Sequence, residues 1–252
     1  MEHIESAKNP KVKQVNRLHH KKYRERDNKF IIEGEHLIET AIEAGVAIER
    51  VFVTNENKLS PLINQANVSL LTVTESIMKE MSQVETPPGL LAVVEMPAHE
   101  LSGPAGKGMY LLLDAVQDPG NAGTMIRTAD AAGLDGVVLG EGTVDPYNDK
   151  VIRSTQGSIF HVPVVKGELT EWIEKCQRQR IPVFGSSLQD GTSHTALGSQ
   201  PAFALLVGNE GAGVRGELLG LTDQNVYLPL YGKAESLNVT VATGILLYHL
   251  RP

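Results

Sequence analysis

The stretch "MYLLLDAVQDPGNAGTMIRTADAAG", from Met109 to Gly133, joins an apolar run to a helical pattern through a turn marked by Pro and Gly. Such a transition is typical of a buried strand that leads into a helix. Met125, Ala129 and Ala132 share one face of that helix, so Arg127 projects from a different face. A strand-to-helix turn has no structural need for an arginine among small residues. The stretch therefore predicts an α/β unit with Arg127 as a candidate functional residue.

The chain around this stretch repeats the same alternation. The candidate strands after residue 108 are "MYLLLDAV", "GVVLG", "PVVK", "IPVFGSS", "FALLVG" and "NVYLPL". Their alternation with helical patterns predicts an α/β fold with a mostly parallel sheet, covered by helices on both faces. Earlier, "FIIEGEHLIETAIEAGVAIERVFVT", "SLLTVT" and "GLLAVVEM" predict a smaller α/β unit. The Pro- and Gly-rich "PAHELSGPAGKG" separates them. We expect domains at 1–96 and 109–252, joined by a linker at 97–108.

Composition excludes several classes of protein. The 252 residues contain no apolar run of the ~18 residues that a membrane helix requires. The charged N-terminus does not resemble a signal peptide. Cys176 is the single cysteine, and the eight histidines lack the spacing of a metal site. We therefore expect a cytoplasmic protein without a metal and without a membrane partner.

Positive charge is concentrated at the start of the chain. Residues 1–30 hold nine Lys and Arg against four acids, a net of +5, although the whole chain carries −7. A basic segment on an acidic body suggests a polyanion partner such as RNA. The candidate contacts in this segment are Lys11, Lys13, Arg17, Lys21, Lys22 and Arg24. The alternative is a solvated charged helix without a ligand.

Two further loops follow candidate strands at the same edge of the predicted sheet. "LLVGNEGAGV", from Leu205 to Val214, has its glycines in the order GxxGxG and lacks the lysine of a P-loop. It is a weak dinucleotide motif, but it suits a backbone that approaches a ligand closely. "LPLYGKAESLNVTVATGILLYHL" runs from Leu228 to Leu250. Ligands bind at the carboxyl ends of parallel strands, so the three loops predict one site.

These three stretches, in this order, closely resemble the three motifs of the SpoU-type RNA ribose 2'-O-methyltransferases of the SPOUT superfamily. "VIRSTQGSIFHVPV", Val151 to Val164, also resembles the family, as does a small leading domain similar to certain ribosomal-protein folds. The resemblance covers essentially the whole chain. It implies a C-terminal trefoil knot that binds S-adenosylmethionine, and a homodimer with the active site near the subunit interface.

The resemblance also assigns roles to individual residues. It implies an active site of Asn121, Arg127, Glu210, Ser236 and Asn238. It implies cofactor contacts from Gly208, Leu228, Leu230 and Leu237. Lys150 and Arg153, beside Ser154, are further candidates for RNA phosphate contacts. "GNEG" matches the family position of Glu210, which is expected to attract the sulfonium or to hold Arg127.

Each assignment has a simpler structural alternative. Asn121 and Ser236 both precede helical patterns and could be N-caps. Arg127 could form a surface ion pair of little energetic value, and Glu210 could be an ordinary loop carboxylate. Lys150 and Arg153 could lie on a solvated face. The last helix is apolar on more than one side, which indicates either burial in the monomer or a dimer contact.

The expected reaction is methyl transfer from S-adenosylmethionine to a ribose 2'-hydroxyl, with ribosomal RNA favoured over transfer RNA. A fixed cation near the oxygen stabilises the developing alkoxide without a metal. Guanidinium groups remain protonated in proteins, so electrostatic stabilisation competes with the family proposal of an arginine base. The alternatives are a noncatalytic RNA-binding protein of this fold and a nucleotide-dependent enzyme that uses the glycine loop.

Overall fold

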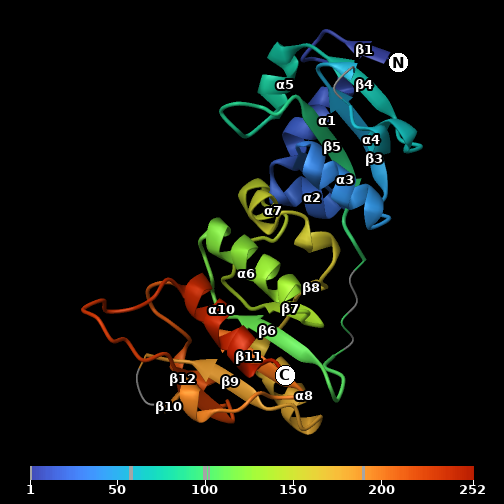
Figure 1. Cartoon of the computed structure of the whole chain (residues 1–252). Helices are drawn as coiled ribbons and strands as arrows, with labels where there is room; N and C mark the ends of the chain where they lie inside the picture. The colour runs from blue at the N-terminus through green and yellow to red at the C-terminus, as the bar shows by residue number, and fades with distance from the viewer. Residues whose placement is uncertain (1, 57–58, 99–100, 102, 189–190) are drawn as a thin grey trace. The chain divides into compact units, whose positions relative to one another are not determined.

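The computed structural model describes residues 2–56, 59–98, 101, 103–188 and 191–252, which form two compact units (Figure 1). The first unit comprises residues 1–98 together with 147–160, and the second comprises 99–146 and 161–252. The segment 147–160, which the sequence places in the second domain, therefore packs with the first unit. The chain passes from one unit to the other at three points.

The first unit contains a five-stranded mixed sheet in the order β1-β4-β3-β5-β2. β1 and β3 run parallel to β4, whereas β5 is antiparallel to both β2 and β3. The strands are β1 (Glu2–Ile4), β2 (Lys29–Glu33), β3 (Ile48–Val53), β4 (Leu70–Val73) and β5 (Leu90–Glu95). The expected strands at "FII", "VFV", "SLLTVT" and "GLLAVVEM" are all present.

Six helices of the described residues accompany this sheet. They are α1 (Pro10–Leu18), α2 (Lys21–Asp27), α3 (Glu35–Glu43), α4 (Pro61–Gln65), α5 (Glu75–Met81) and α7 (Asp149–Thr155), the last followed by the 3-10 turn η2 (Ser158–Phe160). Although α1 belongs to the basic segment, it is amphipathic and buries Val12, Val15 and Leu18. These residues share a core with Phe52 and Leu91 of the sheet. The basic segment is thus an integral part of the first unit.

The second unit is built on a seven-stranded sheet in the order β10-β12-β9-β11-β6-β7-β8. All neighbouring strands in this order run parallel to each other, as expected for alternating strands and helices. The strands are β6 (Met109–Leu113), β7 (Gly136–Leu139), β8 (Val164–Lys166), β9 (Val183–Ser186), β10 (Thr192–Ser193), β11 (Phe203–Val207) and β12 (Gln224–Tyr227). They match all six candidate strands, and only the short β10 was not anticipated.

The helices of the second unit are α6 (Pro119–Ala131), α8 (Leu169–Arg178), α9 (Gly216–Leu219) and α10 (Val239–Leu250), with a 3-10 turn η3 (His194–Ala196). α8 packs Trp172, Ile173 and Cys176 into a core that includes Leu112 and Leu206 of the central strands. α10 packs beside α6, as Figure 1 shows for the red and green helices. None of the described helices is long and apolar enough to cross a membrane.

The strand order of the second sheet reverses next to β6. From β6 the chain builds outward through β7 and β8, and it then returns to the other side of β6 with β9 and β11. In parallel α/β sheets, ligands bind at the carboxyl edge where the order reverses. The loops after β6, β9, β11 and β12 therefore meet at the place where this fold class holds its ligands.

Candidate active site

A cleft of about 370 Å³ opens at this edge of the sheet. The loops after β9, β11 and β12 and the first turn of α10 line it. Six candidate residues from the sequence lie on its walls, namely Gly208, Glu210, Leu228, Leu230, Ser236 and Leu237. The end of β9 and the loop after it add Ser186, Ser187 and Leu188, which were not identified from the sequence. The three glycine-marked loops were expected to form one site, and two of them line this cleft.

The loop after β11 forms a tight turn with little room for side chains. Gly208 is buried, and a Cβ atom placed on it would lie 2.1 Å from the carbonyl carbon of Gly213. The backbones of Asn209 and Gly213 form two hydrogen bonds with each other, and Gly213 has a φ of +71°. Asn209 donates from Nδ2 to the carbonyl oxygen of Ala115, which ties the turn to the loop after β6. Glycine at 208 is therefore a steric requirement of the turn.

A second link joins the same two loops. The buried carboxylate of Asp114 follows β6 directly and accepts hydrogen bonds from the backbone N–H and the Nε of Arg215, both at 2.8 Å. Arg215 is the N-cap residue of α9. A buried carboxylate needs such charged and backbone donors to offset its desolvation. The pair fixes the end of β6 against the end of the β11 loop.

Glu210 organises the beginning of α6. Its Oε1 accepts hydrogen bonds from the backbone N–H of Asp118 at 3.0 Å and from Nδ2 of Asn121 at 3.1 Å, and its Oε2 accepts from the N–H of Gln117 at 3.2 Å. Partial burial acts to raise the pKa of Glu210, but the hydrogen bonds from Asn121 and from backbone N–H groups outweigh it and lower the pKa. Glu210 is thus held as an anion on the wall of the cleft.

Asn121 continues this chain of hydrogen bonds to α10. Its Oδ1 accepts from Nδ2 of Asn238 at 3.3 Å, and Asn238 in turn accepts from the N–H of Thr240 at 2.8 Å. Three of the five candidate catalytic residues are therefore connected, in the order Glu210, Asn121 and Asn238. Within the described residues, Glu210 forms no hydrogen bond or ion pair with Arg127, which leaves attraction of the sulfonium as the other role expected of this carboxylate.

The alternative reading of two residues as N-caps does not match the structure. The N-cap of α6 is Asp118, whose Oδ1 accepts from the N–H of Asn121 at 2.8 Å. The N-cap of α10 is Asn238 instead of Ser236. Asp118 precedes Pro119 at the first helical position, which is a sequence signal for a helix start that could have been used. Asn121 and Ser236 are consequently not required for capping.

Arg127 lies on the exposed side of α6, opposite the buried Met125 and Ala129, as the helical spacing predicted. Within the described part of the chain, its side chain forms no hydrogen bond or ion pair with another residue. The alternative that Arg127 forms a surface ion pair is therefore not supported by the described residues. Arg127 is also not among the residues that line the cleft. The single chain leaves this guanidinium available to a ligand or a second subunit.

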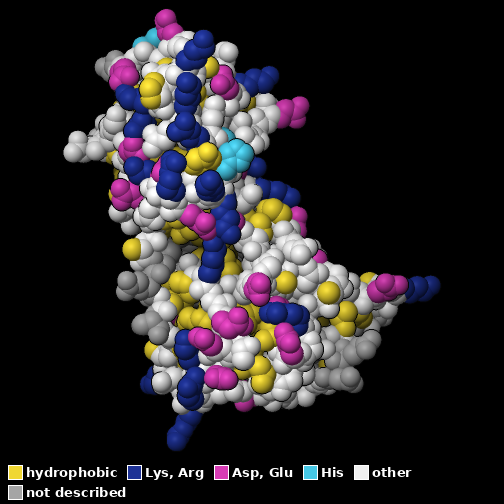
Figure 2. Space-filling view, turned by 180° about the vertical axis from the view of Figure 1, so that it is seen from behind, with side chains coloured by type: hydrophobic (Ala, Val, Ile, Leu, Met, Phe, Trp, Pro, Cys, Tyr) yellow, Lys and Arg dark blue, Asp and Glu magenta, His cyan; other side chains and the backbone are white. Residues whose placement is uncertain are grey.

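The basic candidates of the first unit differ in exposure. Lys13, Arg17, Lys21 and Lys22 are exposed, and Figure 2 shows a row of Lys and Arg side chains along one face of this unit. Arg24, in contrast, is only 3% exposed and donates from Nη1 to the carbonyl oxygens of Leu18 and His19, each at 2.8 Å. It completes the C-terminus of α1, so it is not available to RNA. Lys11 is paired with Glu2 at 2.5 Å.

The remaining two basic candidates lie on α7 of the first unit. Lys150 is exposed and Arg153 is half-buried. Asn148 caps this helix by accepting from the N–H of Lys150. Among the described residues, no cluster of His, Cys, Asp and Glu has the composition of a metal site.

Comparisons with known proteins agree with this geometry. The model of the SpoU rRNA Methylase family matches residues 108–248, and the model of the MRM3-like substrate binding domain matches residues 9–92. The chain is 48% identical to the 23S rRNA (guanosine(2553)-2'-O)-methyltransferase RlmP of Bacillus subtilis, over 100% of both chains. It is 30% identical to the 23S rRNA (uridine(2479)-2'-O)-methyltransferase of Streptomyces viridochromogenes, over 89% of this chain and 83% of that one.

Solved structures resemble the whole chain. The AdoMet-bound rRNA methyltransferase from Sinorhizobium meliloti superimposes with a TM-score of 0.88 at 29% identity, over 99% of this chain and 97% of that one. The methyltransferase AviRb from Streptomyces viridochromogenes, in complex with AdoMet, has a TM-score of 0.84 at 28% identity, over 96% and 97%. Both neighbours hold the cofactor that the three motifs imply. The motifs, the cleft that two of them line and these matches agree, and the chain belongs to the SpoU rRNA methylase family.

Proposed function

We propose that this protein transfers a methyl group from S-adenosylmethionine to a ribose 2'-hydroxyl of ribosomal RNA. The observation that carries the proposal is the cleft at the sheet edge, where Glu210 is tied to Asn121 and Asn238. Ribosomal RNA is favoured over transfer RNA because the 48% identical Bacillus subtilis relative is named for 23S rRNA. Such a substrate implies a cytoplasmic enzyme.

The cleft suits the chemical groups of S-adenosylmethionine. Apolar side chains, among them Leu228, Leu237 and Ala242, can pack against an adenine ring, while Ser186, Ser187 and main-chain groups of the loops offer hydrogen bonds. The anionic Glu210 lies on the same wall, where it complements a sulfonium. The bound cofactor would supply an activated methyl group. Pro229 removes a backbone donor after β12, which fits an irregular segment at a ligand.

The remaining task of the protein is to orient the 2'-oxygen and to stabilise its developing negative charge. Asn121 and Asn238 are fixed by their mutual hydrogen bond, and Asn238 is further fixed as the cap of α10. Such preorganised polar groups do not need to reorganise during the reaction. Arg127 contributes a permanent positive charge from α6, and it stabilises the alkoxide or an adjacent RNA phosphate. The proton leaves to water or phosphate, because guanidinium is already protonated.

A homodimer is part of the proposal. α10 exposes Val241, Ile245 and Tyr248 at 50%, 41% and 58%, with the spacing of a single helical stripe. This stripe lies on the side of α10 opposite the buried Leu246 and Leu250. Its apolar side chains are therefore not covered by the core of the single chain. α6, which carries Arg127, packs beside α10. A second subunit on the stripe would therefore lie near Arg127. The trefoil knot expected of the family is proposed for the chain that runs from β12 through Ser236 to α10.

Replacing Ile245 by Arg is expected to convert the dimer into a monomer, because the stripe would then have to bury an unpaired charge. Sedimentation at micromolar concentration should give about twice 27.3 kDa for the wild type and about 27.3 kDa for the variant. Leu221→Arg is the matched control, since Leu221 is similarly exposed at 39% but lies beside Gln177 of α8. A monomeric wild type, or a dimeric Ile245→Arg variant, would contradict this interface.

RNA binding should depend on the exposed basic residues of α1 and α2. Deleting the basic segment is unsuitable because α1 is part of the core, so we choose the joint change of Lys13, Arg17, Lys21 and Lys22 to Gln. The slope of the logarithm of affinity against the logarithm of salt concentration should fall by about 0.7 for each lost contact with single-stranded RNA. Filter binding across a salt series measures this slope. Joint replacement of Lys175 and Arg178 on α8, which pair with acids of their own helix, is the control. An unchanged slope in the fourfold variant would show that these side chains of α1 and α2 do not contact RNA phosphates.

The test of the function itself is a comparison of 2'-O-methyl sites in ribosomal and transfer RNA from cells with and without the gene. Loss of one or more sites in ribosomal RNA is expected. Loss in transfer RNA alone would support the alternative substrate, and an unchanged pattern would support a noncatalytic RNA-binding protein.

A further inference from the structure

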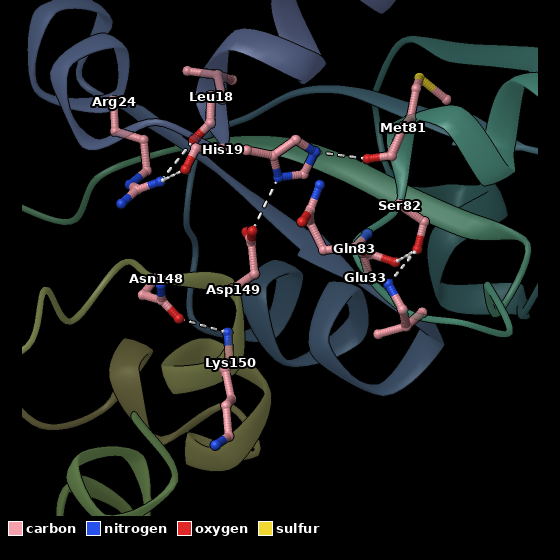
Figure 3. A network of polar contacts seen from close by, with 11 residues as sticks. Leu18, His19, Arg24, Glu33, Met81, Ser82, Gln83, Asn148, Asp149 and Lys150 are labelled. Atoms are coloured by element: carbon pink, nitrogen blue, oxygen red, sulfur yellow. Dashed lines mark hydrogen bonds and ion pairs between the residues drawn. The ribbon is translucent and has the colours of Figure 1, made fainter. Parts of the chain in front are cut away.

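His19 forms hydrogen bonds with both of its ring nitrogens in the first unit (Figure 3). Nδ1 is 2.9 Å from Oδ2 of Asp149, and Nε2 is 2.8 Å from the carbonyl oxygen of Met81. A carboxylate and a carbonyl are both acceptors, so each ring nitrogen must carry a proton. This arrangement is that of an imidazolium. The side chains of His19 and Asp149 are only 11% and 17% exposed, so water can replace these bonds only partly.

The charges around the ring favour the same protonation state. Burial acts to lower the pKa of His19, but the hydrogen bond and charge of Asp149, the carbonyl of Met81 and the charge of Glu33 together raise it. Glu33 lies at the end of β2, where its carboxylate binds the hydroxyl of Ser82 and the N–H of Gln83. On α2, Arg24 directs Nη1 to carbonyl oxygens, including that of His19 itself. His19 is therefore the charged partner of Asp149 from α7.

The helix that His19 holds comes from an excursion of the chain. Segment 147–160 belongs to the first unit, although the residues on both sides of it in the sequence belong to the second. Tyr147 and Phe160, near its two ends, place their rings 4.8 and 6.3 Å from that of Phe30. These contacts anchor the ends of the segment. At the first residue of α7, the ion pair with His19 fixes the helix that presents Lys150 and Arg153.

We propose that protonated His19 is a positioning residue for RNA binding, because its ion pair with Asp149 fixes α7 so that Lys150 and Arg153 bind phosphates together with the basic side chains of α1 and α2. This inference rests on the proposed function in RNA methylation. A neutral ring has only one N–H, so either the carboxylate of Asp149 or the carbonyl of Met81 loses its donor. The start of α7 then loosens, and RNA affinity falls.

The direction of the pH dependence follows from linkage. The folded pKa of His19 is raised, so its contribution is complete below the ordinary histidine value of about 6.5 and is lost as pH rises through the higher folded value. RNA affinity should therefore decline over that range. His19→Gln should bind RNA about tenfold more weakly at pH 6, a typical size for coupling between two sites, and should lack this decline.

The experiment measures binding of an unmodified 23S rRNA transcript by fluorescence anisotropy from pH 5.5 to 8.5, at constant ionic strength. Asp149→Asn separates a role of protonated His19 from a purely structural role, because only the former predicts a change in the midpoint pH. It removes the anion that raises the pKa of His19, so the midpoint of the decline should shift to lower pH. His161→Gln is the matched control, because His161 pairs with Asp130 at 3.1 Å but is 49% exposed in the second unit. It should leave both affinity and midpoint unchanged.

One further measurement keeps the outcomes distinct. Hydrogen exchange in the RNA-free wild type, corrected for the intrinsic pH dependence, should show α7 losing protection as His19 deprotonates, which needs no variant to fold. Identical pH profiles for the wild type and His19→Gln, or constant protection of α7, would overturn the inference. A wild type that binds no RNA at any pH but shows the α7 transition would instead contradict the proposed function.

Discussion

Replacing Arg127 by Ala is expected to reduce the rate of methyl transfer by about a hundredfold or more, because a single preorganised charge at a developing oxyanion commonly contributes that much. The fold and the affinity for S-adenosylmethionine should be unchanged. Arg127 is exposed on α6 and does not line the cleft, and Ala is a good helix former. The measurement is single-turnover transfer of tritiated methyl groups with saturating RNA, accompanied by calorimetry with the cofactor.

Arg178→Ala is the control for this prediction. Arg178 is also an exposed helical arginine of the second unit, at 67%, but it lies on α8 and pairs with Glu174 four residues earlier. Its loss should leave the rate unchanged, since exposed pairs of this kind contribute little. If Arg127→Ala keeps nearly the full rate, Arg127 is a surface residue without a role in the reaction.

Replacing Gly208 by Ala is expected to abolish measurable cofactor binding, with or without RNA. The added methyl group would lie 2.1–2.3 Å from backbone atoms of Gly213 and Val214, which cannot move without opening the turn. That turn also presents Glu210 to Asn121. Isothermal titration with S-adenosylmethionine at up to millimolar concentration measures the effect, and NAD should not compete in the wild type.

Gly216→Ala is the matched control, because a Cβ at this position of α9 meets no atom within 4 Å and the residue is helical. It should bind the cofactor as the wild type does. Thermal unfolding of Gly208→Ala checks that the variant still folds, so that a loss of binding can be assigned to the altered turn. Normal cofactor affinity in Gly208→Ala would mean that the cleft beside the turn is not the cofactor site.

The elements of this fold follow closely from local sequence patterns. The apolar runs from "MYLLLDAV" to "NVYLPL" correspond to β6 to β12, apart from the two-residue β10, because parallel strands covered on both faces must be apolar throughout. The glycine pattern likewise identified the turn at Gly208. The apolar strands and the glycine turn both depend on residues that are neighbours in sequence, so a single stretch is enough to predict each of them.

Features that depend on distant contacts could not be predicted in this way. Segment 147–160 continues the sequence pattern of the second unit, yet its apolar residues pack on β2, more than a hundred positions earlier. Ser186 to Leu188 line the cleft because β9 ends at the same sheet edge, although no glycine cluster marks that loop. Arg24 resembles its basic neighbours in sequence, and only the C-terminus of α1 explains its burial. Periodicity gives the faces of an element but not its distant partners.

The proposed reaction is tested most directly by the position of the methyl group that the purified protein transfers. The protein is incubated with tritiated S-adenosylmethionine and 23S rRNA transcribed without modifications, and the RNA is digested to nucleosides and separated. We expect the label in 2'-O-methylated ribose, and we expect Arg127→Ala nearly to eliminate it. Label on a base, or no transfer to RNA that the protein demonstrably binds, would contradict the proposed reaction.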